Sequence, residues 1–159
     1  MLLLCEALKT HLEGVVQEFP VPKKGSGPTP PEVITGWLIP KSAGPPGDDH
    51  VPCVQIVPIE GSDGPLPEEG GRCSVVMVIQ TWAEDHRGWM DCANILQGIR
   101  TSLLTLPGRT LANKYALTPK DRKILEWRFF EDQPDPYGVA EMTAHFAIPA
   151  PVPVYSWDR

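Results

Sequence analysis

The stretch from Arg72 to Leu106 constrains the fold more than any other, because it predicts a buried strand that leads directly into a helix. The residues from Val75 to Ile79 are all apolar, which is typical of a central strand covered on both faces. A polar turn around Asp85 follows, and its carboxylate suits the start of a helix. Pro107-Gly108 marks the end of that helix. Between these points an apolar residue recurs every three or four positions, at Trp89, Cys92, Ala93, Leu96, Ile99 and Leu103.

The rest of the chain predicts one more helix and four more strands. A stripe of apolar residues with polar residues opposite it predicts a first helix from about Leu2 to Glu18, ending before Pro20. Alternating patterns and apolar runs predict strands at about residues 33–39, 53–59, 124–130 and 138–148. Prolines and glycines predict loops over residues 20–33 and 41–51, and residues 109–123 are expected to form an irregular, basic connection.

The resulting order, α-β-β-β-α-β-β, predicts a single α+β domain with a mostly antiparallel sheet and two main helices packed on it. We assign residues 1–151 to this domain and residues 152–159 to an extended C-terminal tail. In the strand at residues 124–130, Leu125, Trp127 and Phe129 alternate with charged residues. We therefore expect Trp127 to pack between the sheet and the second helix.

Composition narrows the possible functions. The net charge of −6 argues against a protein that grips nucleic acid by neutralising phosphates. The chain has no apolar run long enough for a membrane span, and its first residues lack the basic start of a signal peptide. The cysteines, Cys5, Cys53, Cys73 and Cys92, are scattered along the sequence without a close pair. We therefore expect all of them to be buried free thiols, and we expect the protein to be made inside a cell.

No pattern in the sequence predicts an enzyme, a cofactor or a metal ion. Ser74 and Ser102 lack the Gly-x-Ser-x-Gly context of an activated nucleophile. In the pair Asp85-His86 a carboxylate could orient an imidazole, but a solvated turn explains the pair better. The adjacent residues Asp48, Asp49 and His50 cannot easily converge on one ion.

Three blocks of sequence resemble tail terminator-like proteins of long-tailed phages and prophages. The first block runs from Pro52 to Gly64. The second is Ile79-Gln-Thr-Trp-Ala-Glu-Asp85, followed by Gly88-Trp-Met-Asp91 and a helix that ends in Leu-x-x-Pro. The third runs from Trp127 to Gly138 and leads to Glu141-Met-Thr143 and Ile148-Pro-Ala-Pro151. With the N-terminal helix, the resemblance covers most of the chain, and its weight comes from the order and spacing of the blocks.

The resemblance implies a virion structural protein that is not an enzyme and that assembles as a homo-hexameric ring. Such a ring would cap the tail tube and join it to the neck of the filled head, so the implied partners are the tail tube protein and a head-neck connector protein. DNA would pass through the ring without specific binding, and an acidic channel would let it slide. The protein would be made in the host bacterial cytoplasm and reside in the virion, with no membrane partner.

Two other functions stay open at this point: a head-closure or connector ring protein of the phage neck, and a ligand-binding module unrelated to phages. For a ring subunit, the candidate interaction surfaces are an acidic hairpin tip, an acidic turn and the C-terminal tail, whose apolar residues stand among prolines. The acidic turn could also pair carboxylates for acid–base work, but an exposed turn is the better explanation. The candidate residues are Asp63, Glu68, Glu69, Glu131, Asp132, Asp135, Tyr155 and Trp157.

Overall fold

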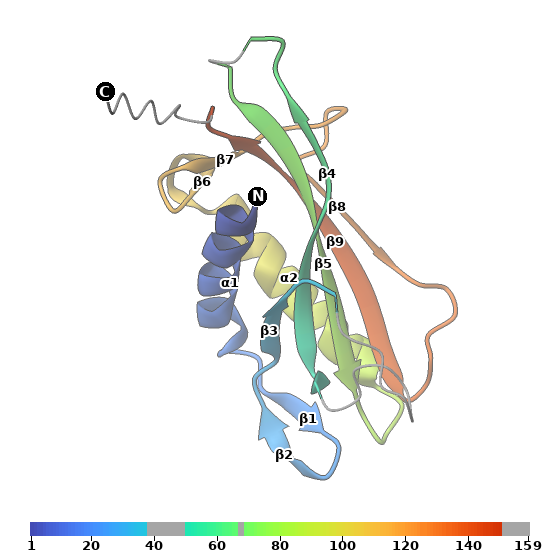
Figure 1. The fold of residues 1–159 in the computed structure, drawn as a ribbon. Coiled ribbons are helices and arrows are strands. Elements are labelled where there is room, and N and C mark those ends of the chain that lie inside the picture. Colours follow the sequence, from blue (N-terminus) through green and yellow to red (C-terminus); the bar gives the residue numbers. More distant parts are fainter. Residues whose placement is uncertain (38–49, 67–68, 151–159) are drawn as a thin grey trace.

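A computed structural model describes residues 1–37, 50–66 and 69–150, and it has the predicted α+β architecture (Figure 1). Two long helices, α1 (Leu2–Val16) and α2 (Gly88–Leu104), pack on a curled, mostly antiparallel sheet. A short 3-10 helix, η2 (Pro107–Arg109), follows α2. The strands are β1 (Val21–Lys23), β2 (Ser26–Thr29), β3 (Glu32–Thr35), β4 (Cys53–Asp63), β5 (Gly71–Trp82), β6 (Thr110–Leu111), β7 (Tyr115–Leu117), β8 (Leu125–Phe129) and β9 (Tyr137–Ile148).

Strand β5 lies at the centre of the main sheet, whose order is β3-β4-β5-β9-β7-β6. Strand β9 pairs with β5 along its whole length, and β7 and β8 share its other edge. The pairing of β3 with β4 is parallel, and the other pairings in this sheet are antiparallel. The prediction that Val75 to Ile79 form a central strand is confirmed, since this segment lies between β4 and β9. Val75, Met77 and Ile79 are fully buried on one face, whereas on the other face Val76 is buried and Val78 is only partly buried, so the predicted cover on both faces is incomplete.

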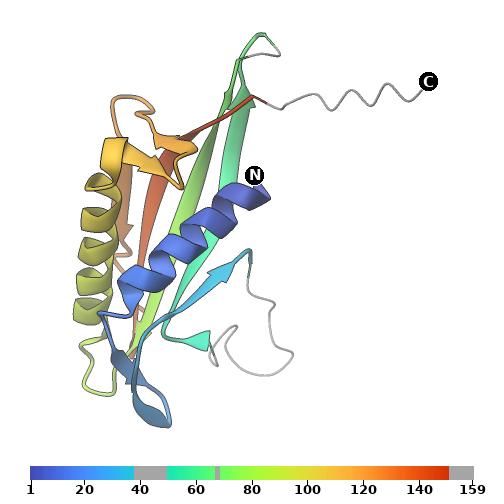
Figure 2. The same cartoon turned by 90° about the vertical axis from the view of Figure 1, so that its left-hand side faces the viewer.

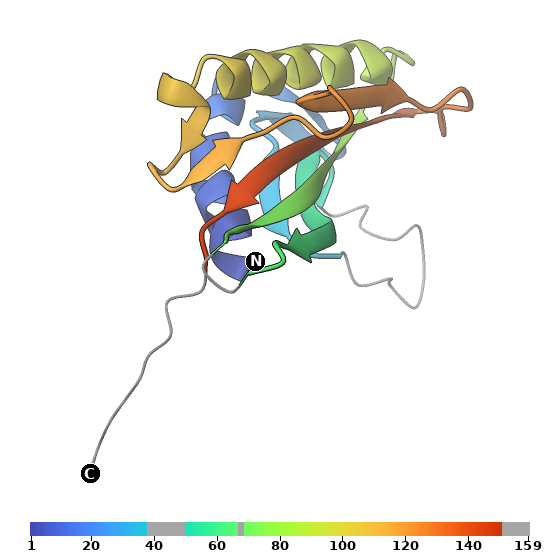
Figure 3. The same ribbon diagram turned by 90° about the horizontal axis from the view of Figure 1, so that it is seen from above.

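Both long helices lie on the same side of the sheet, and the sheet curls around them (Figures 2 and 3). Their apolar stripes face the sheet, where burial of each large aliphatic side chain contributes roughly 1.5–3 kcal/mol. The periodicity in the sequence therefore corresponds to the buried faces. The buried residues are Leu4, Cys5, Leu8, Leu12 and Val16 on α1, and Gly88, Cys92, Ile95, Leu96, Ile99 and Leu103 on α2.

The start of α2 is fixed by a close contact between two glycines. A Cβ added to Gly138, on β9, would lie 2.4 Å from the carbonyl carbon and oxygen of Gly88. In the same junction, the Thr81 hydroxyl donates a hydrogen bond of 2.6 Å to the Gly88 carbonyl. The backbones of α2 and β9 can approach this closely because neither glycine carries a side chain.

The prediction that Trp127 lies in the core is wrong, because its side chain is 53% exposed. Among the described residues, strand β8 pairs with β9 alone, and α2 packs on β5 and β9. Trp127 is therefore on an edge strand, beyond the area that α2 covers, where its ring meets Phe129 edge-on at a centroid distance of 6.4 Å. Trp89, the first residue of the predicted apolar stripe of α2, is also half exposed.

Two segments predicted to be irregular contain short strands. Residues 20–33 include the β1–β2 hairpin and the start of β3, and residues 109–123 include the last residue of η2 and the β6–β7 hairpin. The first predicted strand, at residues 33–39, is the four-residue β3, which begins at Glu32, and residues 38 and 39 lie outside the described ranges. The tail assigned to residues 152–159 also lies outside them.

Candidate interaction surfaces

The first acidic surface is an arm made by the far halves of β4 and β5. Cys53 to Val57 of β4 are buried, whereas Pro58 to Asp63 are exposed, and this end of the hairpin extends past the helices (Figure 1). Asp63 lies opposite Gly71 at the end of the ladder, and Glu69 is exposed in the turn that follows. Two of the three candidate residues of the hairpin tip are thus on an exposed arm. The third, Glu68, lies outside the described residues.

The second acidic surface is the loop between β8 and β9, where Glu131, Asp132 and Asp135 are all exposed. The Asp135 carboxylate accepts a hydrogen bond from His86 Nδ1 at 2.7 Å, which links this loop to the turn between β5 and α2. This hydrogen bond raises the pKa of His86 above its usual value. Asp85 instead accepts a hydrogen bond from the Arg87 backbone N–H at 3.2 Å, so the carboxylate that meets His86 comes from the other loop.

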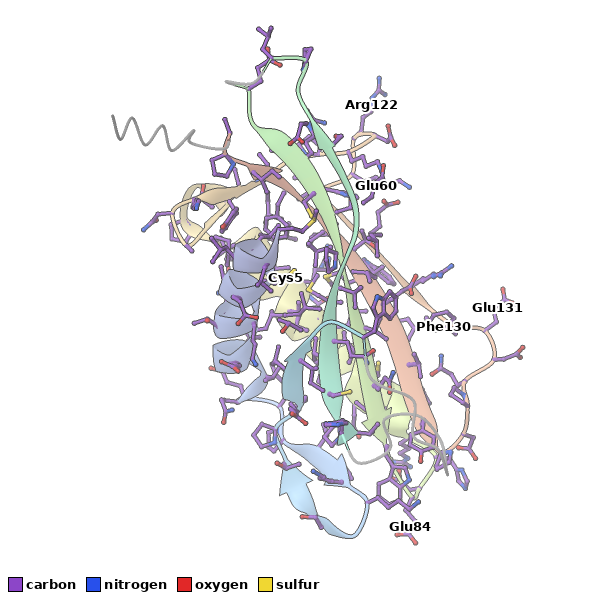
Figure 4. All side chains as sticks on the ribbon, in the orientation of Figure 1. Cys5, Glu60, Glu84, Arg122, Phe130 and Glu131 are labelled. Carbon is purple, nitrogen blue, oxygen red and sulfur yellow. The ribbon has the colours of Figure 1, made fainter. Side chains whose placement is uncertain are left out.

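These two acidic surfaces belong to opposite ends of the sheet. Ile148 of β9 lies opposite Gly71 beside the arm, and Tyr137 lies opposite Trp82 beside the His86–Asp135 pair. The twelve residues of β9 span roughly 40 Å along the strand, at about 3.3 Å per residue. Figure 4 shows Glu60 on the arm far from Glu84 in the turn after β5, with Glu131 of the β8–β9 loop at a height between them. A single contact with a small partner therefore cannot cover both surfaces.

Part of the basic connection between α2 and β8 is neutralised within the chain. Lys120 Nζ lies 2.5 Å from Glu60 Oε2 on the arm, and Lys123 Nζ lies 2.7 Å from Glu126 Oε1 on β8. The hydrogen bond from Lys120 lowers the pKa of Glu60, and that from Lys123 lowers the pKa of Glu126. Lys120 thus links the connection to the arm, whereas Lys123 pairs with a near neighbour in sequence at the start of β8. Exposed Arg122 lies on the turn between them (Figure 4).

A serine, a histidine and a glutamate form a chain of hydrogen bonds across β5, β9 and β8. Ser74 Oγ lies 2.8 Å from His145 Nδ1, and His145 Nε2 lies 3.3 Å from Glu126 Oε2. An ionised carboxylate only accepts hydrogen bonds, so Nε2 carries a proton, and in the neutral imidazole Nδ1 then accepts the hydroxyl proton of Ser74. Ser74 and His145 are both buried, and they are direct cross-strand neighbours.

This arrangement has the residue types of a hydrolytic triad, but its position favours a structural role. A nucleophilic serine needs donors aimed at the oxygen of the tetrahedral intermediate. Ser74 lies in mid-strand between β4 and β9, so its own backbone N–H belongs to the sheet ladder. The small cavity beside it holds about 140 Å³ and is also lined by Arg72 and by the paired Lys120 and Glu60, but the Ser74 hydroxyl is already bonded to a buried histidine. We therefore interpret the chain of hydrogen bonds as a tie between three strands.

Five exposed apolar residues, together called the apolar patch, come from the start of the chain and from the arm. Leu2 is 71% exposed and Leu66 is 50% exposed. Met1 packs against the base of the arm, with its Sδ atom 3.2 Å from Cys73 Sγ. The sequence pattern does not predict this patch, although Leu2 and Leu3 fall outside the buried stripe of α1. Its members are Met1, Leu2, Leu3, Ile59 and Leu66.

An open groove of about 760 Å³ separates α1 from α2 on the helical side. His11 Nε2 lies 3.1 Å from Ser102 Oγ at its edge, and burial lowers the pKa of His11. Ser102 in turn donates to the Ile99 carbonyl, so the His11 side chain ties the two helices together. Phe19 packs against Gly98 at the end of the groove.

The four cysteines are buried free thiols, as predicted. Burial raises the pKa of Cys53 and of Cys92 to about 12, which leaves both thiols protonated and unreactive near neutral pH. Within residues 1–37, 50–66 and 69–150, no three His, Cys, Asp or Glu side chains come together as a metal site would require. No helix in the same part of the chain is long and apolar enough to cross a membrane.

Of the candidate residues, the structure brings none of the hairpin-tip group together with the β8–β9 loop group, and Tyr155 and Trp157 lie outside the described residues. Comparison with models of known protein families found no match, and a search of curated proteins found no significant similarity.

Proposed function

We propose that this chain is the subunit of a ring that ends the tail tube of a long-tailed phage and joins it to the neck of the head. The observation that carries the proposal is the ordered set of three sequence blocks that resemble tail terminator-like proteins. In the fold these blocks are β4, the junction of β5 with α2, and the β8–β9 hairpin. The second and third blocks meet directly at the contact between Gly88 and Gly138. The resemblance therefore falls on one continuous part of the domain.

The distribution of charge supports a channel for DNA. The chain has a net charge of −6, and its acidic surfaces lie at both ends of β9. In a hexamer whose long strands run along the channel, both openings would carry carboxylates. Such openings repel phosphates, so DNA slides through without being held. The tail tube protein and a head-neck connector protein would then bind the two opposite faces of the ring.

Electron microscopy of particles from a phage or prophage that lacks this gene tests the proposal. Loss of the terminator should give overlong tails, and the wild-type gene supplied from a plasmid should restore tail length. Tails of normal length on leaking or unfilled heads would refute the terminator function and support a head-closure ring instead. Normal particles would exclude both ring functions and leave a ligand-binding module.

Assembly of the purified chain gives a second test. Six copies, each with a charge of −6, repel one another, and the screening length falls from about 30 Å at 0.01 M salt to about 8 Å at 0.15 M salt. Light scattering should therefore show mostly monomers at low salt and rings as salt or divalent cations are added. A ring that is stable at low salt and dissociates as salt rises would mean that complementary ion pairs dominate the interface.

A further inference from the structure

The far half of β4 has an edge that no strand in the described part of the chain covers. Strand β3 pairs with Cys53 to Ile56 only. Beyond that point, β4 continues to Asp63 and pairs with β5 alone. An edge of this kind presents unpaired backbone N–H and C=O groups, to which an extended segment can add as a further strand.

The alternation of the ladder identifies the residues whose backbone groups face this free edge. The Gly36 N–H donates to the Ile56 carbonyl, so even-numbered residues of β4 up to Ile56 face β3. Pro58 has no N–H, and the bulge between Pro58 and Glu60 shifts the alternation by one residue. Beyond the bulge the backbone groups of Gly61 and Asp63 therefore face outward. The available pairing surface is short and well defined.

Exposed apolar residues lie close in sequence or in space to this short edge. Ile59 is half exposed immediately before it, and Leu66 is half exposed beyond its end. Met1 lies beside Gly61, with its Cε atom 3.6 Å from the position of a Cβ on that glycine. Leu2 and Leu3 are exposed next to Met1. A strand that pairs with Gly61 and Asp63 would thus also cover apolar surface, which backbone pairing alone would not provide.

The segment that follows β9 has the matching chemistry. Prolines at positions 149, 151 and 153 alternate with Ala150, Val152 and Val154. In an extended strand, the N–H and C=O groups of every second residue point to the same edge. All the backbone donors from Pro149 to Val154 therefore lie on one edge of the segment, and the other edge has none. Such a strand can pair on one side only, so its addition to an edge does not create a new pairing edge.

The position of this segment favours a second copy of the chain over its own β4. Ile148 lies opposite Gly71, which lies opposite Asp63, so β9 ends level with the end of β4. To reach its own free edge, the chain would have to cross β5 and β4 and then reverse direction, which an extended proline-rich segment resists. A chain of nine residues, the length of 151–159, can span at most roughly 30 Å, at about 3.3–3.6 Å per residue, which is enough to reach a neighbour.

We propose that residues 150–154 of one copy add as a strand to Gly61–Asp63 of a second copy, with Tyr155 and Trp157 placed to cover the apolar patch at the base of the arm. The contact is head-to-tail, since each copy gives one tail and receives another, and this is the type of interface that closes into rings. The inference rests on the proposed function in naming the subunit contact of the ring.

Two pairs of substitutions in the full-length chain test the contact. Gly61→Pro and Val152→Pro each remove one backbone donor of the pairing, so the concentration of half-assembly in analytical ultracentrifugation should rise at least about tenfold. The matched controls are Gly61→Ala and Pro151→Ala, which keep those donors. Each should change the concentration of half-assembly by less than about twofold. A Cβ on Gly61 meets its neighbours at 3.4 Å or more, so the alanine fits. Circular dichroism melting establishes that each variant is folded.

Mixing gives a sharper result. Gly61→Pro retains a working tail and Val152→Pro retains a working edge, so the mixture should form heterodimers but no larger species. Assembly of Gly61→Pro at the wild-type concentration would overturn the inference. It would also be overturned if Pro151→Ala weakened assembly as much as Val152→Pro, because the contact would then not depend on which edge of the tail carries the donors.

A peptide assay separates this inference from the proposed function. If the wild-type chain stays monomeric, a fluorescent peptide of residues 149–159 is added to it. Binding that Gly61→Pro abolishes and Gly61→Ala retains would support the docking site and count against the ring. Absence of binding to a monomeric wild-type chain would overturn the docking site as well. Rings that form equally well with and without an intact Gly61 edge would retain the ring function and exclude this contact.

Discussion

Replacing Gly138 with alanine should strongly destabilise the fold, because the new methyl group would overlap the backbone of α2. The Cβ would lie 2.4 Å from both the carbonyl carbon and the carbonyl oxygen of Gly88, and 2.6 Å from the backbone nitrogen of Trp89. Unbonded heavy atoms pack comfortably at about 3.5–4.0 Å, so the overlap with each of these atoms is about 1 Å. Backbone atoms cannot rotate away as a side chain can. Helix α2 must therefore move away from β9 by a comparable distance.

That movement affects more than the junction itself. The buried face of α2 packs on β5 and β9 through Ile95, Ile99 and Leu103, so a displacement of the helix loosens contacts along its length. Overpacking of a well-packed site typically costs about 1–3 kcal/mol, and the backbone location places this case at or above the upper limit. We expect a loss of about 3–4 kcal/mol, which for a chain of this size lowers the melting temperature by roughly 10 °C.

Urea unfolding followed by tryptophan fluorescence measures the loss directly, with Gly14→Ala as the matched control. Gly14 lies in α1, is exposed, and has no atom within 4 Å of an added Cβ. Alanine in a helix interior is favoured over glycine by about 0.5–1 kcal/mol, so the control should be slightly stabilised. If Gly138→Ala unfolds within about 1 kcal/mol of wild type, the junction is looser than the distances indicate and the reasoning is wrong.

Three further predictions concern single side chains. Trp127→Ala should lower the free energy of unfolding by less than about 1 kcal/mol in the same urea assay, because the side chain is half exposed. Phe146→Ala, at a fully buried position, should lower it by about 3–5 kcal/mol, and equal losses for the two variants would contradict the burial pattern. The pKa of His86, which its hydrogen bond to Asp135 raises, should fall towards the usual value in Asp135→Asn, as measured by NMR titration. Because the folded-state pKa is raised, this link stabilises the fold at low pH and is lost as the pH rises through that pKa; an unchanged titration would exclude it. Titration of the unreduced protein with a thiol reagent should find all four thiols after denaturation and almost none before; two or fewer after denaturation would indicate a disulfide.

The helices and long strands were predictable because their patterns extend over many residues. The stripes of α1 and α2 each repeat over several turns, and the apolar run of β5 is long enough to indicate burial on both faces. The short strands were missed for the opposite reason. Strands β1 and β2 lie between Val21 and Thr29 in a stretch with two prolines and two glycines, and β6 has two residues only. Segments of this length contain too few side chains for a period to be visible.

The error at Trp127 has a different origin. Alternation shows which residues of a strand share a face, but it does not show where the strand lies in the sheet. Leu125, Trp127 and Phe129 do alternate with charged residues, yet β8 is an edge strand that α2 does not cover. Whether an apolar face is buried depends on the neighbouring element, which the local sequence does not specify.

Two polar contacts, His86 with Asp135 and Ser74 with His145, could not be predicted from the sequence, because each joins residues that are far apart in the chain. His86 meets Asp135, 49 residues away, and Ser74 meets His145, 71 residues away. Each pair forms only because β5 lies beside β9. The sequence marked His86 and Asp135 as members of two separate polar turns, and the register of the central pair brings these turns together.

The long separation between β5 and β9 also determines the order in which the chain can fold. Strands β4 and β5 are joined by a short connection, so this hairpin can form early in folding. Strand β9 is separated from β5 in sequence by α2 and by β6 to β8, so its pairing with β5 closes a much longer loop and is expected later. Until β9 has paired, β5 exposes a full-length apolar edge that the native protein never presents. Intermediates with such edges are prone to aggregate, and association between chains becomes faster as their concentration rises. Aggregation of this protein should therefore occur during refolding and increase with the concentration of the refolding chain. The folded protein should remain unaggregated at the same concentration.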